Sequence, residues 1–372
     1  MMRAFPSSIP APSVTNSCLA SALLALAEAD PGSRSSLEYR VAAGMLRQLP
    51  QDLHGRRIRV ASLPEVSPRA AGAIENFMAC GSDDLVDDQL AAILDRPDPA
   101  EGRKRDFLSR ADVDRILSSP EGLSPADLRG DLHLHTDRSD GTIPLASLHS
   151  ALSARGDSYA FLTDHARDCA VAGGLFADDF RAQRREVDAL NDRSETGFLM
   201  FLGAESNITE DGTLDVTPAS VPELSAVVAS IHTELRSPKD QTSRLLRAIE
   251  TPGVAVLGHP RGRLYNLRGG IKANWPRVFE AAARHGVAVE LNGCPERLDL
   301  DPSLARLAMG SGCLFSISSD AHARRHLEFL SYGLAVARLA AIPPERVVNT
   351  FSRDRFQAWL EARGAGAEWT PD

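Results

Sequence analysis

From residue 131 onward, short apolar runs alternate with longer amphipathic stretches of the sequence. Seven such runs occur, at 131–135, 159–163, 198–202, 227–231, 254–257, 287–289 and 314–317. Apolar runs of this length, separated by helical patterns, are typical of units in which parallel strands are covered by helices. The spacing therefore predicts an α/β fold with seven parallel strands.

Each of these runs ends in side chains of the kind that bind metals. In a β/α barrel the carboxyl ends of the strands meet on one face, where sites are built. Six of the ten histidines stand at such ends. The candidate ligands are His133, His135, Asp140, His165, Glu205, His232, His259, Asp320 and His322. Histidines scattered through a core or a surface would not fall at strand ends six times, so the pattern indicates one metal site.

The first run shows how a strand aims such ligands. His133 and His135 alternate with Leu132 and Leu134. Residues two apart on a strand point to the same side, so both imidazoles project together. Neutral imidazole is the commonest nitrogen ligand of metals. A surface strand can also carry such a pair, and the prediction of a metal therefore depends on the other strand ends.

Residues 16–81 have a different, all-helical pattern. Apolar residues predict helices over 19–29 and 37–49, and Ser67-Pro68 supplies an N-cap and a first-turn proline for a third helix. We expect residues 1–15 to form a flexible lead-in and 82–128 a linker with short helices. The predicted order is a small all-α domain, this linker, and an α/β domain over 129–372.

Charge and cysteine content limit the class of protein. The net charge of -9 gives no support to nucleic-acid binding over the whole surface. Residues 1–79 carry eight arginines and six acidic residues, a balance of +2 that leaves -11 for the rest. The five cysteines form no Cys-x-x-Cys pair, and neither a membrane span nor a signal peptide is recognisable. We therefore expect a cytoplasmic protein without a membrane partner.

Taken together, the strand-end motifs resemble those of the PHP (polymerase and histidinol phosphatase) domain. They are His133-x-His135-Thr136, Ser139-Asp140-Gly141, Thr163-Asp164-His165, Gly203-x-Glu205, Ser230-Ile-His232, Gly258-His259-Pro260 and Ser319-Asp320-Ala-His322. Pro295-x-Arg-Leu-Asp299 and Val348-Asn-Thr350 are similar to the PHP domain that ends bacterial family X DNA polymerases. The resemblance covers roughly residues 129–352 and implies a distorted (β/α)₇ barrel.

The resemblance also implies three divalent metal ions. His133, His135, Glu205 and Asp320 would hold the first, and Glu205 would bridge to a second held by His232 and His259. Asp140, His165 and His322 would hold the third. Zinc, manganese and iron all accept such mixed nitrogen and oxygen ligands. Clustered dications lower the pKa of a bound water and neutralise phosphate oxygens, so the implied reaction is hydrolysis of phosphate esters by metal-activated hydroxide.

Four further residues are candidates for supporting roles. Asp164 would orient a ligand rather than bind metal itself. Arg261 and Arg263, close behind His259, would meet the substrate phosphate, although a solvent-exposed loop arginine is an equally good reading of each. Asn292 is a candidate for substrate contact.

The helical front end resembles the start of family X polymerases. Leu63-Pro64-Glu65-Val66-Ser67 stands where a helix-hairpin-helix would have a glycine-rich, phosphate-binding turn. Both glycines are missing and Glu65 adds a carboxylate, so the turn is either a DNA-binding element or a structural remnant. About 50 residues separate Phe77 from Arg129, too few for a polymerase palm.

Three functions follow as competing hypotheses. The leading one is a metal-dependent phosphoesterase acting on DNA 3′ ends in repair, as a 3′–5′ exonuclease, 3′-phosphatase or abasic-site enzyme. The second is a phosphatase or phosphodiesterase for small molecules, of the histidinol-phosphate or nucleotide kind. The third is a non-catalytic, metal-stabilised scaffold, which is disfavoured because every ligand position is filled.

Overall fold

A computed structural model describes residues 14–54, 59–94, 107–166, 173–265 and 267–367. The chain divides into two compact units, Met1–Ser119 and Pro120–Asp372. The predicted lead-in lies outside the described residues except for Val14 and Thr15. Among the described residues, no helix is both long and apolar enough to cross a membrane.

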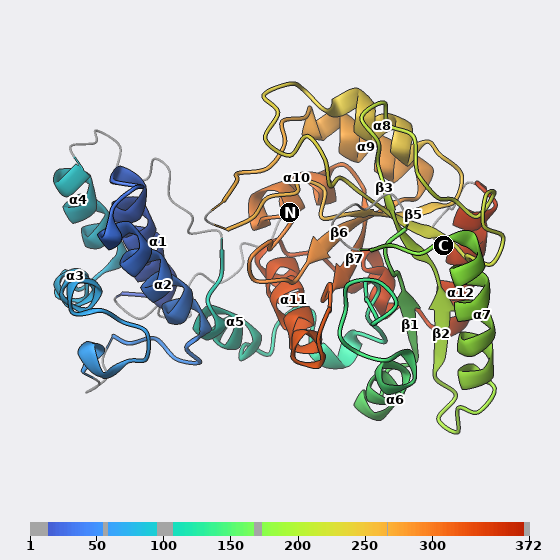
Figure 1. Ribbon diagram of the computed structural model, residues 1–372, viewed down its shortest axis with the longest axis horizontal. Coiled ribbons are helices and arrows are strands. Elements are labelled where there is room, and N and C mark those ends of the chain that lie inside the picture. Colours follow the sequence, from blue (N-terminus) through green and yellow to red (C-terminus); the bar gives the residue numbers. More distant parts are fainter. Residues whose placement is uncertain (1–13, 55–58, 95–106, 167–172, 266, 368–372) are drawn as a thin grey trace. The chain divides into compact units, whose positions relative to one another are not determined.

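The first unit is entirely helical, as Figure 1 shows in blue and cyan. Its α-helices are α1 (Asn16–Ala29), α2 (Arg34–Gln48), α3 (Pro68–Met78), α4 (Asp83–Leu94) and α5 (Arg110–Leu117). Side-chain caps set several helix starts: Thr15 accepts from the Cys18 amide, and Ser67 accepts from Ala70 at the start of α3. Leu19, Leu23 and Leu46 are fully buried between the helices.

Helices α4 and α5 belong to this unit although the sequence places them in a linker. Asp83, at the start of α4, accepts hydrogen bonds from the backbone and hydroxyl groups of Thr15 at 2.8 and 3.0 Å. Asp112 of α5 accepts a hydrogen bond from the Ser17 hydroxyl of α1. Polar contacts between residues far apart in the sequence tie both helices to α1, and the acidic, Pro-containing composition of this stretch does not reveal them.

The second unit is built on parallel strands covered by helices (Figure 1). Its strands are β1 (Tyr159–Leu162), β2 (Leu199–Leu202), β3 (Ala204–Asn207), β4 (Val227–Ser230), β5 (Val254–Gly258), β6 (Ala288–Asn292) and β7 (Leu314–Ser318). Its α-helices are α6 (Leu145–Arg155), α7 (Ala177–Asn191), α8 (Thr242–Ile249), α9 (Trp275–His285), α10 (Pro302–Gly310), α11 (Leu330–Leu339) and α12 (Arg353–Gly364). β1 pairs with β2, and β3 to β7 pair in sequence order, all in parallel. The α/β class is confirmed.

The segment 129–135 closes these strands into a ring. On one side the amides of Phe161 and Thr163 donate to the carbonyls of Asp131 and Leu134, both at 3.0 Å. On the other side the His135 amide donates to the carbonyl of Ala321 at 3.0 Å. At the remaining junction, the Glu205 amide of β3 donates to the Thr163 carbonyl after β1 at 3.1 Å. The first and last parts of the barrel therefore meet at the His133–His135 segment.

Two of the predicted strands differ in detail from the observed ones. The run 131–135 forms only a single bridge, between Leu134 and Ala321. It is not a regular strand because a side chain replaces a backbone partner: the Leu134 amide donates to the Thr163 hydroxyl. The run 198–202 ends as β2, and Gly203 separates it from β3. A Cβ atom at Gly203 would lie 2.2 Å from the Phe161 ring, so only glycine fits there.

Helix α12 covers the end of the barrel where the strands begin. Trp359 donates from its indole nitrogen to the Gly286 carbonyl at 3.2 Å, just before β6. Phe356 stacks on Tyr159 of β1 with ring centroids 4.1 Å apart. The Tyr159 hydroxyl donates to the Val348 carbonyl at 3.0 Å. Because this end is packed with aromatic rings, the opposite end, where the strands finish, is left for polar chemistry.

Candidate metal centre

Glu205, near the start of β3, is the centre of the predicted ligand cluster and is buried. Its Oε1 atom lies 2.8 Å from His259 Nε2 and 3.3 Å from His232 Nε2. Its Oε2 atom lies 3.2 Å from His133 Nε2 and 3.5 Å from His135 Nε2. The same Oε2 atom also lies 3.1 Å from His165 Nδ1. The two carboxylate oxygens thus face two different groups of histidines, which is the arrangement of a bridging ligand.

Asp320, just after β7, faces the same first pair of histidines. Its Oδ1 atom lies 3.3 Å from His135 Nε2 and 3.9 Å from His133 Nε2. Asp320 has a φ of 54°, a left-handed conformation in a residue that is not glycine. His259, with a φ of 24°, is the second strained ligand of the cluster. Such strain is held in place by surrounding structure and is concentrated at functional sites.

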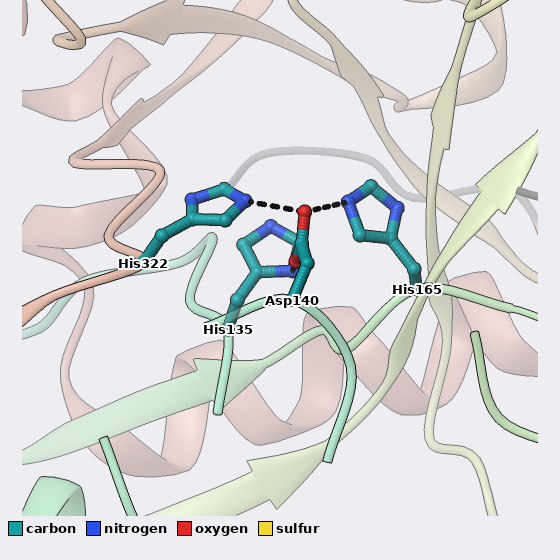
Figure 2. A group of neighbouring side chains, drawn as sticks. All are labelled: His135, Asp140, His165 and His322. Carbon is teal, nitrogen blue, oxygen red and sulfur yellow. Dashed lines mark ion pairs between the residues drawn. The ribbon is translucent and has the colours of Figure 1, made fainter. Parts of the chain in front are cut away.

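Asp140 and three histidines form a second group beside Glu205. Figure 2 shows the Asp140 carboxylate between the rings of His322 and His165, next to the ring of His135. Its Oδ2 atom lies 3.2 Å from His322 Nε2 and 3.6 Å from His165 Nε2. His135 Nδ1 lies 3.8 Å from Asp140 Oδ1, so His135 borders this group as well as the Glu205 group.

The structure therefore brings all nine predicted ligands together at one end of the barrel. Three sets of donor atoms are close enough to hold an ion each, and they share His135, His165 and Glu205. The three sets are His135, Asp140, His165 and His322; His133, His135 and Glu205; and His165, Glu205 and His232. Which residue binds which ion stays a prediction.

Charge keeps the carboxylates of this cluster ionised. Burial alone would raise the pKa of Glu205, but positive charge on His165 and His133 holds that pKa well below its ordinary value. Burial would lower the pKa of His133, yet the carboxylates of Glu290 and Glu205 raise it well above the ordinary range. The buried carboxylates thus require positive charge beside them, which divalent cations would supply.

The unsatisfied nitrogens of the cluster fit metal ions. The Nε2 atoms of His133 and His135 are buried and make no hydrogen bond, although carboxylate oxygens lie 3.2 and 3.3 Å away. A buried polar atom without a partner costs about 1–3 kcal/mol. Imidazole nitrogens and carboxylate oxygens form a donor set that suits zinc, manganese or iron. The residues present therefore fit divalent metals.

Hydrogen bonds behind the ligands fix their orientation. His133 Nδ1 lies 2.7 Å from Glu290 Oε1, and the Ser318 hydroxyl donates to the same oxygen at 2.7 Å. His232 Nδ1 lies 2.6 Å from the Asn207 side-chain oxygen. Such outer contacts select the ring nitrogen that is left for a metal. The strand-end pattern does not identify Asn207 in this role.

Asp164, predicted to orient a ligand, accepts four hydrogen bonds and is buried. Oδ1 accepts from the Thr136 amide at 2.7 Å and the Ser139 hydroxyl at 2.6 Å. Oδ2 accepts from the Thr136 hydroxyl and from Gln183 of α7, both at 2.6 Å. Asp164 thereby ties the end of β1 to the turn that carries Asp140.

The predicted substrate-binding residues have other partners in the structure. Arg261 Nη1 lies 2.6 Å from Asp301 Oδ2, and Arg263, only 2% exposed, donates from Nε to the Arg297 carbonyl at 2.9 Å. Asn292 is buried and donates to Asp320 Oδ2 at 3.1 Å. These contacts give Arg263 a structural role in place of the predicted substrate contact, because buried guanidinium groups need nearby carbonyls, which a sequence does not locate.

Arg297 is the basic residue that sequence reasoning missed. Its Nε atom lies 3.1 Å from Asp320 Oδ2, and Asp320 is foremost among the carboxylates that raise the Arg297 pKa. The signal was present in Pro295-x-Arg-Leu-Asp299, but the position of its arginine depends on contacts with loops far away in the sequence.

The hairpin-like turn at 63–67 in the first unit has a residue in the left-handed backbone conformation, although that residue is not glycine. Glu65 has a φ of 63°, the left-handed conformation that glycine adopts most readily. Ser67 caps α3 and donates from its hydroxyl to Glu38 Oε2 at 2.8 Å. With two carboxylates beside it, this helix start is poorly suited to a phosphate group.

Comparison with known proteins places the barrel in a family. No family model matches the chain. The chain is 33% identical over 254 residues to the DNA polymerase/3′-5′ exonuclease PolX of Bacillus subtilis, and the matched region covers 68% of this chain and 44% of that protein. The chain is 30% identical over 247 residues to a "Probable phosphatase" of Edwardsiella ictaluri, and the matched region covers 63% of this chain and 94% of that protein. "Probable phosphatase YcdX" of Escherichia coli is 27% identical over 246 residues.

Solved structures of histidinol phosphatases also match. The enzyme of Lactococcus lactis, solved with zinc, L-histidinol and phosphate, has 16% identity and a TM-score of 0.41, and the match covers 57% of this chain and 93% of that one. A putative histidinol phosphatase of Listeria monocytogenes has 13% identity and a TM-score of 0.42, covering 53% of this chain and 97% of that one.

The chain belongs to the PHP family of metal-dependent phosphoester hydrolases. Within that family it shares its matched region both with an exonuclease-bearing polymerase and with stand-alone phosphatases. It spans less than half the length of the B. subtilis polymerase.

Proposed function

We propose that this protein hydrolyses phosphate esters at DNA 3′ ends, as an exonuclease, 3′-phosphatase or abasic-site enzyme. The observation that carries the proposal is the ligand cluster around Glu205, with three adjoining donor sets at the open end of the barrel. Bound dications there would lower the pKa of a water ligand and neutralise phosphate charge. The choice of DNA is supported by the 33% identity to a polymerase with 3′–5′ exonuclease activity.

The residues of the chain supply orientation and charge around that chemistry. Glu290 and Asn207 fix the rings of His133 and His232, and Asp164 holds the turn that carries Asp140. Arg297, whose Nε atom lies 3.1 Å from Asp320 Oδ2, is placed to offer its remaining N–H groups to an oxygen of the substrate phosphate. The core of the barrel is made of buried apolar side chains, and a surrounding of low polarity strengthens electrostatic interactions.

A small phosphate ester is the alternative substrate. It is favoured by the similarity to a phosphatase that this chain covers over 94% of its length. The carboxylates of Glu38 and Glu65 at the hairpin-like turn, and the net charge of -9, also weigh against DNA. A non-catalytic scaffold is the weakest candidate, because inactive members of a metallohydrolase family are expected to lose ligands.

A comparison of substrates tests the proposal. The purified full chain is incubated with Mn²⁺ or Zn²⁺ and with end-labelled primers that carry a 3′-hydroxyl, a 3′-phosphate or an abasic end. His133→Ala is the inactive control, and p-nitrophenyl phosphate represents small esters. We expect the wild type to process at least one DNA end and His133→Ala to be at least about 100-fold slower, since the variant loses a metal ligand. Hydrolysis of the small ester with untouched DNA ends would replace the proposal by its alternative.

A further inference from the structure

A turn after β3 brings a carboxylate back to the residue that orients His232. Asn207 is the last residue of β3, and Asp215 stands eight residues beyond it. The turn between them is closed by a hydrogen bond from the Gly212 amide to the Thr209 carbonyl at 3.0 Å, and Gly212 has a φ of 86°. The Asp215 amide then donates to the Asn207 carbonyl at 3.3 Å. The folded turn therefore places Asp215 directly beside Asn207.

The Asp215 carboxylate contacts both the backbone and the side chain of Asn207. Its Oδ1 atom accepts from the Asn207 backbone amide at 2.8 Å and lies 2.7 Å from the Ser206 hydroxyl. Its Oδ2 atom accepts from Nδ2 of Asn207 at 2.5 Å. Asp215 is half-buried and Asn207 is buried. Because a carboxylate only accepts hydrogen bonds, the NH₂ group of the Asn207 side chain has to face Asp215.

This orientation of the Asn207 amide decides which nitrogen of His232 carries the hydrogen. With its NH₂ group at Asp215, Asn207 turns its side-chain oxygen to His232, 2.6 Å from Nδ1. An amide oxygen only accepts, so the hydrogen of the neutral ring lies on Nδ1 and the lone pair lies on Nε2. That Nε2 atom lies 3.3 Å from Oε1 of Glu205, on the side of the predicted metal. The free lone pair thus points where a metal ligand needs it.

Other contacts hold the ends of β3 and β4 together. Arg244 of α8 is buried and donates to the carbonyls of Thr209 and Thr233 at 2.7 and 3.1 Å. Thr209 follows β3, and Thr233 follows His232 directly. Since this guanidinium group already joins the two segments, the specific contribution of Asp215 is the orientation of one amide group.

We propose that Asp215 is a positioning residue that sets the tautomer of His232 through Asn207 and thereby prepares Nε2 for the predicted metal beside Glu205. Without this carboxylate, the Asn207 amide can rotate by half a turn and present its NH₂ group to Nδ1. The ring hydrogen then moves to Nε2, where it blocks a metal. The inference rests on the metal centre of the proposed function and not on its substrate, so zinc binding tests it separately from any hydrolysis assay.

Nitrogen-15 NMR of the full chain, labelled at histidine, reads the tautomer, because the two ring nitrogens differ in chemical shift according to which one carries the hydrogen. The metal-free protein is measured at about pH 9, where the histidine imidazole is ordinarily neutral. The His232 signal is the one that disappears in His232→Gln. The same signal is then followed in chelator-buffered zinc, which gives the zinc affinity of the site that contains His232.

The deciding variant is Asp215→Asn. The oxygen of the new amide group stays with the Asn207 backbone amide, which can only donate, so its NH₂ group faces the NH₂ group of Asn207 and favours rotation of that side chain. We expect the hydrogen of His232 to move from Nδ1 to Nε2 and the zinc affinity to fall about 10- to 100-fold. The matched control, Asp211→Asn, removes the same charge from an exposed position of the same turn and should leave both measurements as in the wild type.

Exchanging the two side chains tests the direction of the hydrogen bonds. In the double variant Asn207→Asp with Asp215→Asn, the carboxylate at position 207 accepts from Nδ1 of His232 and from the amide at position 215. We expect the hydrogen to return to Nδ1 and the zinc affinity to recover to within about threefold of the wild type.

A wild type with the hydrogen on Nε2 would overturn the proposal. So would Asp215→Asn with the hydrogen still on Nδ1 or with unchanged zinc affinity, and so would an exchange variant that still binds zinc weakly. If Asp215→Asn does not fold, the exchange variant decides. A hydrogen on Nδ1 with recovered affinity supports the proposal, whereas a hydrogen on Nε2, or failure of this variant to fold, would leave Asp215 only a role in folding.

Discussion

Replacing Asp164 by alanine should damage both the barrel and the metal group around Asp140. Three of the four donors to Asp164 are buried: the Thr136 amide, the Thr136 hydroxyl and the Gln183 amide. Ser139 is half-buried and can bond to water instead. At about 1–1.5 kcal/mol for each of these three buried hydrogen bonds, we expect Asp164→Ala to lower the free energy of unfolding by about 3–4.5 kcal/mol.

Tryptophan fluorescence measures this loss in the barrel alone. Residues 1–119 contain no tryptophan, so urea unfolding followed by tryptophan emission is not mixed with unfolding of the helical unit. Trp275 and Trp359 lie in α9 and α12 of the barrel. The affinity for zinc, measured by competition with a chelator, should fall about 10- to 100-fold at the weakest site, the usual effect of losing a partner behind the ligands.

Asp164→Asn is the matched control. The side-chain oxygen of the asparagine can keep the hydrogen bonds from the Thr136 amide and the Ser139 hydroxyl. Its new NH₂ group can donate to Gln183 Oε1, an oxygen that is buried without a partner, if the side-chain amide of Gln183 rotates by half a turn. We expect a loss of about 1 kcal/mol. An Asp164→Ala variant with unchanged zinc affinity would refute the argument that Asp164 positions the turn carrying Asp140.

Three further predictions concern single residues. Asp140→Ala should lower the metal content by one ion per chain and leave the ion between His133 and Glu205, as elemental analysis can check. Arg297→Gln should lower kcat/KM on the preferred ester about 10- to 100-fold with unchanged metal content, whereas equal activity would exclude its contact with phosphate. Burial raises the pKa of Asp299 to about 6, so its stabilising neutral form is present below pH 4 and lost as the pH rises through 6. Asp299→Asn, which cannot ionise, should show a flatter melting temperature between pH 4 and 8.

The ligand cluster could be predicted from the sequence because strand order and strand ends are local signals. The apolar run before His259 and the one before Asp320 each predict a strand, and parallel strands bring their ends together. Glu205 could be predicted as a metal ligand from its position directly after the apolar run 198–202. The all-helical pattern of the first unit is equally local.

The support around the ligands could not be predicted, because it depends on contacts between distant segments. His133 and Glu290 are 157 residues apart, and nothing near either residue indicates their 2.7 Å contact. Arg263 and Arg297 lie in similar loops, yet the first is buried against carbonyls and the second faces Asp320. The sequence prediction placed Arg263 at the substrate and gave Arg297 no role, because no local pattern distinguishes the two arginines.

The barrel closes at the segment that carries His133 and His135, and this has a consequence for synthesis of the protein. On the ribosome these histidines are made first, while Asp320 and His322 are made last. Until β7 has been synthesised and has paired, every predicted metal set that includes Asp320 or His322 is incomplete. Loading of the first and third predicted metals therefore belongs to the final stage of folding, and these two bound ions would join the first-made and last-made parts of the barrel.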